Sequence, residues 1–511
     1  MKKILNTGFI CFLFCSIIFS AHAQSGPLGI FDDQGDIGPV KHKGSGTYDD
    51  KLQQYHLSGS GSNVWATHDE FHYVWKKMKG DFILRTNIAF VGKGVEEHRK
   101  IGWMVRSSLD TNSKHVSAVV HGNGLTSLQY RSKVSGVTAE KQFKITTTDD
   151  VIQLERKNGV YTMSVAKQGE TFVSEKIDSL DLGDDVYVGL FICSHNADVT
   201  EKATFNNVRI VVPAGKNLVP YRNYIGSSIE ILDLENQNSR IIYQIPTSLQ
   251  APNWVKSGKS LIYNREGLLY NFDLATLTPT VINTGAANKN NNDHVISFDG
   301  KMLAVSSGNG ANGASLGFTV PIGGGIAKQI TPTGPSYMHG WSPDGKYIVF
   351  CGDRNGEFDV YRIPSGGGPE VRLTTAKGLD DGPEYSPDGK YIYFNSVRSG
   401  LMQVWRMKAD GSEQTQITND DFDNWFPHVS PDGKWIVYIT FMKDEVSPGD
   451  HPFYKHVYLR VMPASGGPSK VIAYLYGGQG TINTPSWAPD SKHLAFVSNS
   501  SLLFPVFPIG N

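Results

Sequence analysis

The chain has 511 residues, with 48 Lys and Arg, 49 Asp and Glu, and a formal net charge of −1. That balance gives no electrostatic reason to expect nucleic acid or an anionic membrane as a partner, because both attract basic surfaces. Only two of its four cysteines, Cys193 and Cys351, lie beyond the first 23 residues, and two such distant cysteines do not make a disulfide scaffold, so burial must stabilise the core.

The N-terminus has the pattern of a secretory signal peptide over residues 1–23. Two lysines precede a short apolar run at residues 9–19, and Ala21-His22-Ala23 stands before Gln24. No other stretch reaches the ~20 apolar residues of a transmembrane helix. We expect an exported protein without a transmembrane segment, either periplasmic or secreted to the cell surface.

Residues 24–213 show no helical period and alternate apolar with polar residues between polar turns. This pattern is typical of an antiparallel β-sandwich. The alternating runs lie at residues 82–88, 101–105, 116–120, 151–155, 161–165 and 186–190. Their order resembles the concanavalin-like (laminin-G-type, jelly-roll) domains that stand beside carbohydrate-active modules. The resemblance implies a glycan-associated first domain.

One segment of this region concentrates aromatic, imidazole and acidic side chains. A sugar-binding interpretation would use Trp65, His72 and Trp75, with aromatic faces against the ring and His on the hydroxyls. The alternative is a core strand in which Phe71, Tyr73 and Trp75 alternate into the interior. The sequence leaves both interpretations open.

A linker at residues 214–226 leads into a region with an internal repeat. Six copies of a turn phrase recur, three of them as Ser-Pro-Asp-Gly. They end at Gly258, Gly300, Gly345, Gly389, Gly433 and Ser491. The spacings of 42, 45, 44, 44 and 58 residues match the ~40–45 residues of a four-stranded propeller blade. Residues 227–511 therefore predict an all-β, six-bladed propeller.

The two ends of the repeat region predict how the ring closes. The last copy supplies only inner strands, and residues 228–233 and 240–244 can supply the outer strands of the same blade. A blade shared by both ends leaves no open sheet edge. Residues 502–511 are expected to extend or cover that blade.

The repeats resemble the WD40-like motifs of the TolB propeller family over roughly residues 227–498. Trp341-Ser-Pro-Asp-Gly-Lys346 is the most characteristic copy. In TolB the propeller docks a partner lipoprotein in the periplasm. The resemblance therefore implies a bacterial exported propeller, with a protein partner at the propeller face as one alternative.

Chemistry is predicted at one mouth of the channel, where the inner strands of all blades begin. Three imidazoles stand near that position and form a candidate metal set, His294, His339 and His428. Imidazoles with carboxylates suit one divalent ion, Mn²⁺, Zn²⁺ or Ca²⁺. Without a metal, Asp381, Glu384 and His428 are candidate acid–base groups.

Two loops are expected at the same face. Residues 443–456 form a long connection in the fifth blade that could serve as a lid, and residues 477–483 form a Gly-rich approach. The candidate substrate-binding residues around the mouth are Asp293, Trp425, His451, Gln479 and Asn483.

A second resemblance is to oligogalacturonate lyases, which are also TolB-like propellers. Their family binds a divalent metal through His residues at the channel mouth, and His294 and His339 stand where such ligands would lie. Those lyases have seven blades, whereas six are counted here. No catalytic base can be matched, so lysis of pectin is not implied.

Two functions follow as hypotheses. The first is a carbohydrate-associated protein whose propeller mouth binds or processes a glycan, as a hydrolase or lyase if it is an enzyme. The second is a non-catalytic propeller that mediates protein–protein contact in the periplasm. Nucleotide chemistry is not indicated, because the sequence has no phosphate-binding glycine loop that opens a helix.

Overall fold

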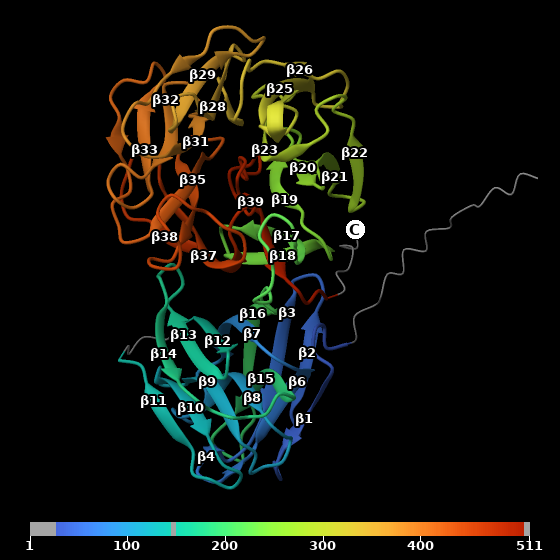
Figure 1. Ribbon diagram of the computed structural model, residues 1–511. Helices are drawn as coiled ribbons and strands as arrows, with labels where there is room; N and C mark the ends of the chain where they lie inside the picture. The colour runs from blue at the N-terminus through green and yellow to red at the C-terminus, as the bar shows by residue number, and fades with distance from the viewer. Residues whose placement is uncertain (1–26, 145–149, 505–511) are drawn as a thin grey trace, which may run out of the picture.

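The computed structural model describes residues 27–144 and 150–504, so the predicted signal peptide lies outside the described residues. The protein has two all-β lobes, an N-terminal lobe and a propeller (Figure 1). In the described ranges the one helical element is a 3₁₀ turn, η1 (Ala311–Gly313). The search of those ranges found no helix long and apolar enough to cross a membrane.

The N-terminal lobe contains two seven-stranded antiparallel sheets. In spatial order the first sheet comprises β1 (Asp33–Ile37), β6 (Phe71–Met78), β15 (Val186–Cys193), β8 (Lys100–Arg106), β9 (His115–His121), β10 (Thr126–Arg131) and β11 (Ala139–Gln142). The second comprises β14 (Val173–Ile177), β13 (Val160–Ala166), β12 (Val151–Lys157), β7 (Phe82–Val91), β16 (Glu201–Val211), β3 (Gln54–Gly59) and β2 (Ser45–Asp49). A short hairpin adds β4 (Val64–Trp65) and β5 (His68–Asp69).

The two sheets bury one common hydrophobic cluster. Trp103 and Leu190 enter it from the first sheet, and Leu84 and Ile152 enter it from the second. Every second side chain of these strands is apolar and points to the same face, which is the period of a half-buried strand. Burial between the sheets therefore stabilises this lobe, as the low cysteine count predicts.

The second lobe contains the six predicted blades. Blades 1 to 5 are complete four-stranded antiparallel sheets. Their strands are β19 (Gln250–Trp254), β20 (Ser260–Arg265), β21 (Leu268–Asp273), β22 (Thr278–Ile282); β23 (Asn290–Ile296), β24 (Met302–Ser307), β25 (Leu316–Pro321), β26 (Lys328–Gln329); β27 (Ser336–Trp341), β28 (Tyr347–Asp353), β29 (Phe358–Pro364), β30 (Val371–Arg372); β31 (Asp380–Tyr385), β32 (Tyr391–Ser396), β33 (Gln403–Lys408), β34 (Thr415–Gln416); and β35 (Asp423–Val429), β36 (Trp435–Phe441), β37 (Lys455–Pro463), β38 (Lys470–Gly477).

The sixth blade closes the ring with both ends of the lobe, as predicted. β39 (His493–Ser500) pairs along its whole length with β17 (Gly226–Asp233), and β17 pairs with β18 (Asn238–Ile245). An isolated bridge between Trp487 and Leu494 adds the innermost position. The ring therefore has no open edge at its junction.

The chain beyond the last strand was expected to extend or cover the sixth blade, and its described part lies between that blade and the first lobe. Leu502 and Phe504 pack against the core of the N-terminal lobe. The Phe504 amide donates to the side-chain oxygen of Gln244 in β18. Residues 505–511 lie outside the described residues.

The recurring turn phrase has one repeated hydrogen-bond pattern. In the copy at residues 342–346, the Ser342 hydroxyl donates to Asp344 at 2.7 Å, and the Lys346 amide donates to the same carboxylate oxygen at 3.1 Å. Gly345 has a φ of +71°, a conformation that costs glycine little. The same bonds recur at Ser386 and Ser430. The repeat in the sequence is therefore a repeat of one turn.

The inner strands of blades 1 to 5 share an irregularity that matters for function. Each contains a β-bulge or register shift against its neighbour, where extra residues leave the regular ladder and their side chains are redirected. The shifts lie between Gln250 and Asn253, Asn290 and His294, Met338 and Gly340, Asp381 and Glu384, and Trp425 and His428.

Candidate functional site

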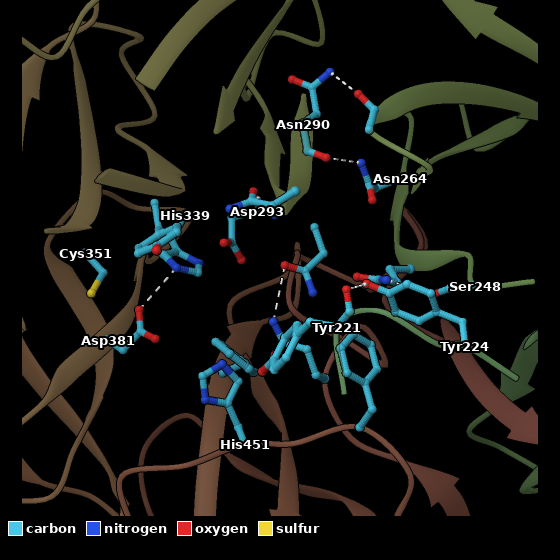
Figure 2. A pocket seen from close by; sticks show the side chains of 18 of the residues that line it. Tyr221, Tyr224, Ser248, Asn264, Asn290, Asp293, His339, Cys351, Asp381 and His451 are labelled. Carbon is cyan, nitrogen blue, oxygen red and sulfur yellow. Dashed lines mark hydrogen bonds and ion pairs between the residues drawn. The ribbon is translucent and has the colours of Figure 1, made fainter. Parts of the chain in front are cut away.

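The mouth of the propeller channel holds a cavity of about 960 Å³ (Figure 2). This size is within the range of small-molecule sites in proteins. It is lined by blades 1 to 5, by the loop before the sixth blade, and by two tyrosines of the linker between the lobes, Tyr221 and Tyr224.

Three titratable side chains point into one side of the cavity. Asp293, His339 and Asp381 come from blades 2, 3 and 4, and each is less than one-tenth exposed. The Nε2 atom of His339 lies 3.2 Å from Asp381 Oδ1. Figure 2 shows Asp293 beside the same imidazole. The site thus places two carboxyl groups around one histidine.

The surroundings shift the pKa values of the two carboxyl groups in opposite directions. Burial raises the pKa of Asp293 to about 6, helped by the charge of Asp381 and opposed by His339. Burial also disfavours the Asp381 carboxylate, but its hydrogen bond to His339 and the imidazolium charge hold its pKa below the ordinary value. Two like groups with opposite shifts are the pattern of an acid–base site.

The surroundings of His339 favour its charged form. Burial opposes the charge on its imidazole, but the hydrogen bond to Asp381 and the surrounding carboxylates outweigh burial and raise its pKa. Both shifts favour the ion-paired form of His339 and Asp381, whereas Asp293 is the carboxyl whose pKa is raised to about 6.

The β-bulges bring three of the lining side chains to the cavity. His339 stands between the paired residues Met338 and Gly340 and has no partner in the ladder. Asp293 lies in the corresponding irregular stretch of blade 2. Phe426 lies in that of blade 5, with a φ of +52°. Bulges redirect side chains in this way beside active sites.

The remaining walls of the cavity are aromatic and amide-rich. The aromatic side chains are Tyr221, Tyr224, Tyr337, Phe358, Phe426 and Phe453, and the amides are Gln250, Asn264, Asn290, Asn291, Asn292 and Gln479. Among the residues that line this cavity in the described chain, none is Lys or Arg. The site therefore offers apolar faces, hydrogen bonds and negative charge.

The long loop of blade 5 forms one rim. His451 lines the cavity, and its ring lies 4.2 Å from the ring of Trp425. Burial lowers the pKa of His451, so the imidazole is neutral. Phe453 follows on the same loop, with its ring 5.3 Å from that of Tyr221 in the linker. The loop and the linker thus share one aromatic wall.

Five of the predicted mouth residues meet at the cavity, namely Asp293, His339, Asp381, His451 and Gln479. Two other predicted residues pack behind the side chains that line the cavity. Trp425 is fully buried beneath His451, and Asn483 donates to the Gln479 side chain at 3.2 Å. These two side chains position their neighbours and do not line the cavity.

Glu384 and His428, predicted as catalytic, lie elsewhere in the channel wall. His428 Nδ1 is 2.5 Å from Glu384 Oε2, and its Nε2 is 2.5 Å from the carbonyl of Ile482. The other oxygen of Glu384 accepts the Val429 amide at 3.1 Å. Both groups are saturated by protein partners, and they connect blades 4, 5 and 6 rather than face the cavity.

The predicted metal set does not converge. His294 is fully buried, its Nε2 lies 3.3 Å from the carbonyl of Ile262, and it does not line the cavity. Both nitrogens of His428 are engaged. Only His339 of the three faces the cavity. Within residues 27–144 and 150–504 no group of three or more His, Cys, Asp or Glu has metal-binding geometry, so the three imidazoles do not fit one ion.

In the N-terminal lobe the structure places the predicted sugar ligands in different surroundings. Trp75 belongs to a hydrophobic cluster with Phe71 and Tyr73, which is the core-strand alternative. His72 is buried, with Nδ1 2.8 Å from Asp36. Trp65 is partly exposed and lies under the Lys100 ammonium. The three side chains do not form one exposed aromatic surface.

Several lining residues were missed by the sequence interpretation. The linker tyrosines gave no signal, because only the docking of the two lobes brings them to the mouth. The asparagines at residues 290–292 could have been found, since they directly precede the Asp293 position. Tyr337 stands two residues before His339, and side chains two apart share a strand face.

Comparisons with known proteins agree with this architecture. The family model for the TolB beta propeller domain matches residues 328–450. The uncharacterized protein Atu1656 of Agrobacterium fabrum is 44% identical over 272 residues, covering 53% of this chain and 92% of its own. The structure of a putative TolB from Agrobacterium tumefaciens is 42% identical with a TM-score of 0.52, covering 55% of this chain and all of its own. Through its second lobe, this chain belongs to the TolB-like β-propeller family.

Proposed function

We propose that this protein is an exported, carbohydrate-associated enzyme whose propeller mouth binds and cleaves a glycan. The observation that carries the proposal is the cavity of about 960 Å³, where a His339–Asp381 pair and the buried Asp293 share one wall. Aromatic and amide side chains line the remainder. Sugar recognition uses this combination, because pyranose rings have both an apolar face and hydroxyl groups.

The charges of the cavity favour a neutral glycan. Asp293, Asp381 and Glu266 line it, and none of the described residues around it is a Lys or Arg that could pair with a uronate. An acidic sugar would be desolvated beside carboxylates, and the one cationic group there, His339, is already paired with Asp381, which makes its binding costly. Neutral oligosaccharides are therefore expected to bind better than uronic-acid chains.

Asp293 is assigned the role of general acid. Its pKa of about 6, raised by burial, keeps about half of it protonated at pH 6 and about one-tenth at pH 7. A protonated carboxyl can deliver a proton to a leaving sugar oxygen. In hydrolysis the glycosidic C–O bond would break as Asp293 gives its proton to the leaving oxygen and a water molecule adds to the anomeric carbon. The Asp381 carboxylate, held in place by His339, would take the proton that this water loses. No step requires a metal ion.

The N-terminal lobe is proposed to be a concanavalin-like sandwich. The two seven-stranded sheets around a common core support this assignment. Its direct contribution to the site is the linker, which carries Tyr221 and Tyr224 into the aromatic wall. Export follows from the signal-peptide pattern at residues 1–23.

The test is a panel of neutral and uronic-acid polysaccharides incubated with the mature protein and with Asp293→Asn. Products are detected by mass spectrometry, and binding is measured by calorimetry. We expect cleavage of at least one neutral glycan by the wild type and none by the variant. Binding without cleavage would leave a recognition propeller, and binding confined to uronates would contradict the charge argument.

A further inference from the structure

A second cavity, of about 270 Å³, lies between the two lobes. The second sheet of the N-terminal lobe forms one wall, and the loop and strands of blade 5 form the other. Direct hydrogen bonds cross this interface beside the cavity, such as Phe172 N to Tyr458 Oη at 3.1 Å and Val471 N to Gly169 O at 2.9 Å. In Figure 1 the same sheet faces β37 and β38 of the propeller.

Four polar residues form one cross-strand row on the wall of this cavity. Arg85 of β7 is opposite Gln153 of β12, which is opposite Ser164 of β13, which is opposite Ser174 of β14. Directly opposed residues of neighbouring strands point to the same face of a sheet. All four line the cavity, so the row presents one guanidinium, one amide and two hydroxyls to it.

Arg85 is a buried cation without a protein partner. Its side chain is 8% exposed, and within residues 27–144 and 150–504 it makes no hydrogen bond and no ion pair. Arg209 is directly opposite it on β16 and takes the nearest carboxylate, Glu230, at 2.6 Å. Burial lowers the pKa of Arg85 to about 10, against the attraction of Glu230, which Arg85 shares with Arg209 without a direct contact of its own. An uncompensated buried charge is strongly unfavourable, which points to an external counterion.

We propose that the cavity between the lobes binds a small oxyanion, a phosphate, sulfate or carboxylate group, with Arg85 as its cationic anchor. Guanidinium groups bind such anions through paired hydrogen bonds. Gln153 and the Ser164–Ser174 pair can add donors, and so can the Tyr458 hydroxyl, which accepts the Phe172 amide and keeps its own hydrogen.

The two acidic residues that line the cavity, Glu155 and Glu445, do not serve as the counterion of Arg85. Glu155 is paired with His456 at 3.2 Å. The hydrogen bond to Glu155 outweighs burial and raises the pKa of that imidazole. Glu445 is exposed on the blade 5 loop. Neither carboxylate contacts Arg85, and both confine the anion to the Arg85 end of the cavity.

An anion at this position would join the two lobes. Its ligands come from β7, β12, β13 and β14 on one side and from Tyr458 of β37 on the other. A ligand that binds only the docked, folded form stabilises that form in proportion to ln(1 + [L]/Kd). The same docking holds the linker tyrosines at the propeller mouth, so the anion would also support the first site.

The test is thermal unfolding of the full mature chain in sodium phosphate, sulfate or acetate, each against sodium chloride of equal ionic strength. We expect at least one oxyanion to raise the Tm of the wild type saturably, by about 2–4 °C at a hundredfold excess over its Kd. Calorimetry with the same three anions identifies which group the site prefers.

Arg85→Met is the decisive variant, and Lys167→Met, at an exposed position of the same lobe, is the matched control. The anion response should vanish in Arg85→Met and persist in Lys167→Met. Without an anion, Arg85→Met should unfold at the same or a higher temperature than the wild type, because it removes an uncompensated charge. If Arg85→Met does not fold, Arg85→Lys should bind the anion at least tenfold more weakly. No saturable shift with any of the three anions, or a shift unchanged by both substitutions, would overturn the proposal.

Discussion

The mouth and the wall of the propeller channel contain the same residue types in different roles. At the mouth, Asp293, His339 and Asp381 border a cavity. In the wall, Glu384 and His428 are equally buried but engaged by protein groups on every side. The bulges account for part of the difference. Asp293 and His339 lie inside bulges, whereas Glu384 and His428 stand where the regular ladder resumes. Asp381 reaches the cavity from the last paired position before its bulge. A buried acid or imidazole in a propeller channel is therefore a site candidate only if its hydrogen-bonding capacity is left open.

Loss of the proposed acid at the mouth should give the largest effect. Asp293→Asn is expected to lower turnover at least 100-fold while binding is retained, since general acid catalysis contributes 10²–10⁴-fold. Wild-type turnover should fall as the pH rises through about 6, the pKa of Asp293 raised by burial. A pH–rate profile measures both. A flat profile between pH 5 and 7 would remove Asp293 from this role.

The same carboxyl predicts a stability change of defined sign. Its folded pKa of about 6 exceeds the ordinary 3.8, so the folded protein retains a proton that the unfolded chain has released. That contribution to stability is present below pH 3.8 and is lost as the pH rises through about 6. At pH 8, Asp293→Asn should therefore be more stable than the wild type, by about 1–3 kcal/mol. Denaturant unfolding at pH 4 and pH 8 checks this, and a variant less stable at pH 8 contradicts it.

A matched pair of carboxylates sharpens the comparison between mouth and wall. Asp381→Asn removes the partner of His339 and should lower turnover by about 10–100-fold with a small change in stability. Glu384→Gln should instead lower the free energy of unfolding by about 1–3 kcal/mol, because the His428 pair loses its charge, with turnover per folded molecule retained. Kinetics and denaturant unfolding of both variants separate the roles. Loss of turnover in folded Glu384→Gln would place the chemistry in the wall.

The aromatic wall should act on binding more than on chemistry. Tyr221→Ala removes the ring that contacts Phe453 at the rim, and we expect KM to rise about 5–20-fold with kcat nearly unchanged. Tyr347→Ala, at a partly exposed position of blade 3 outside the cavity lining, is the control. A fall in kcat for Tyr221→Ala would show that the linker also contributes to the chemical step.

Removal of metal ions should have the smallest effect. Because His294 and His428 are turned away from His339, treatment with EDTA is expected to leave turnover within about twofold of the untreated protein. Elemental analysis of protein prepared without a His tag provides the second measurement. A near-stoichiometric ion that disappears in His294→Ala/His339→Ala would restore the metal site predicted from the sequence.

The propeller could be predicted from the sequence because one turn repeats. The Ser342–Asp344–Gly345 phrase specifies its own hydrogen bonds, so counting its copies counts blades and locates closure. The site was predicted only in part. His294 and His339 have the same spacing from their turns, but only His339 occupies a bulge, and a bulge changes side-chain direction without a sequence motif. The linker tyrosines depend on how two lobes dock, which local patterns do not contain.

Ring closure also dictates when this protein can finish folding. β17 opens the propeller at Gly226 and pairs with β39, which ends at Ser500. Strand pairs so distant in sequence form late and slowly, because the loop between them must be ordered first. A chain emerging N-terminus first can complete its first lobe early, but β17 and β18 must wait for nearly all of the remaining polypeptide. During that interval the unpaired edge of β17 is exposed to other chains. The pairing of β39 therefore both closes the ring and ends the period in which this edge can aggregate.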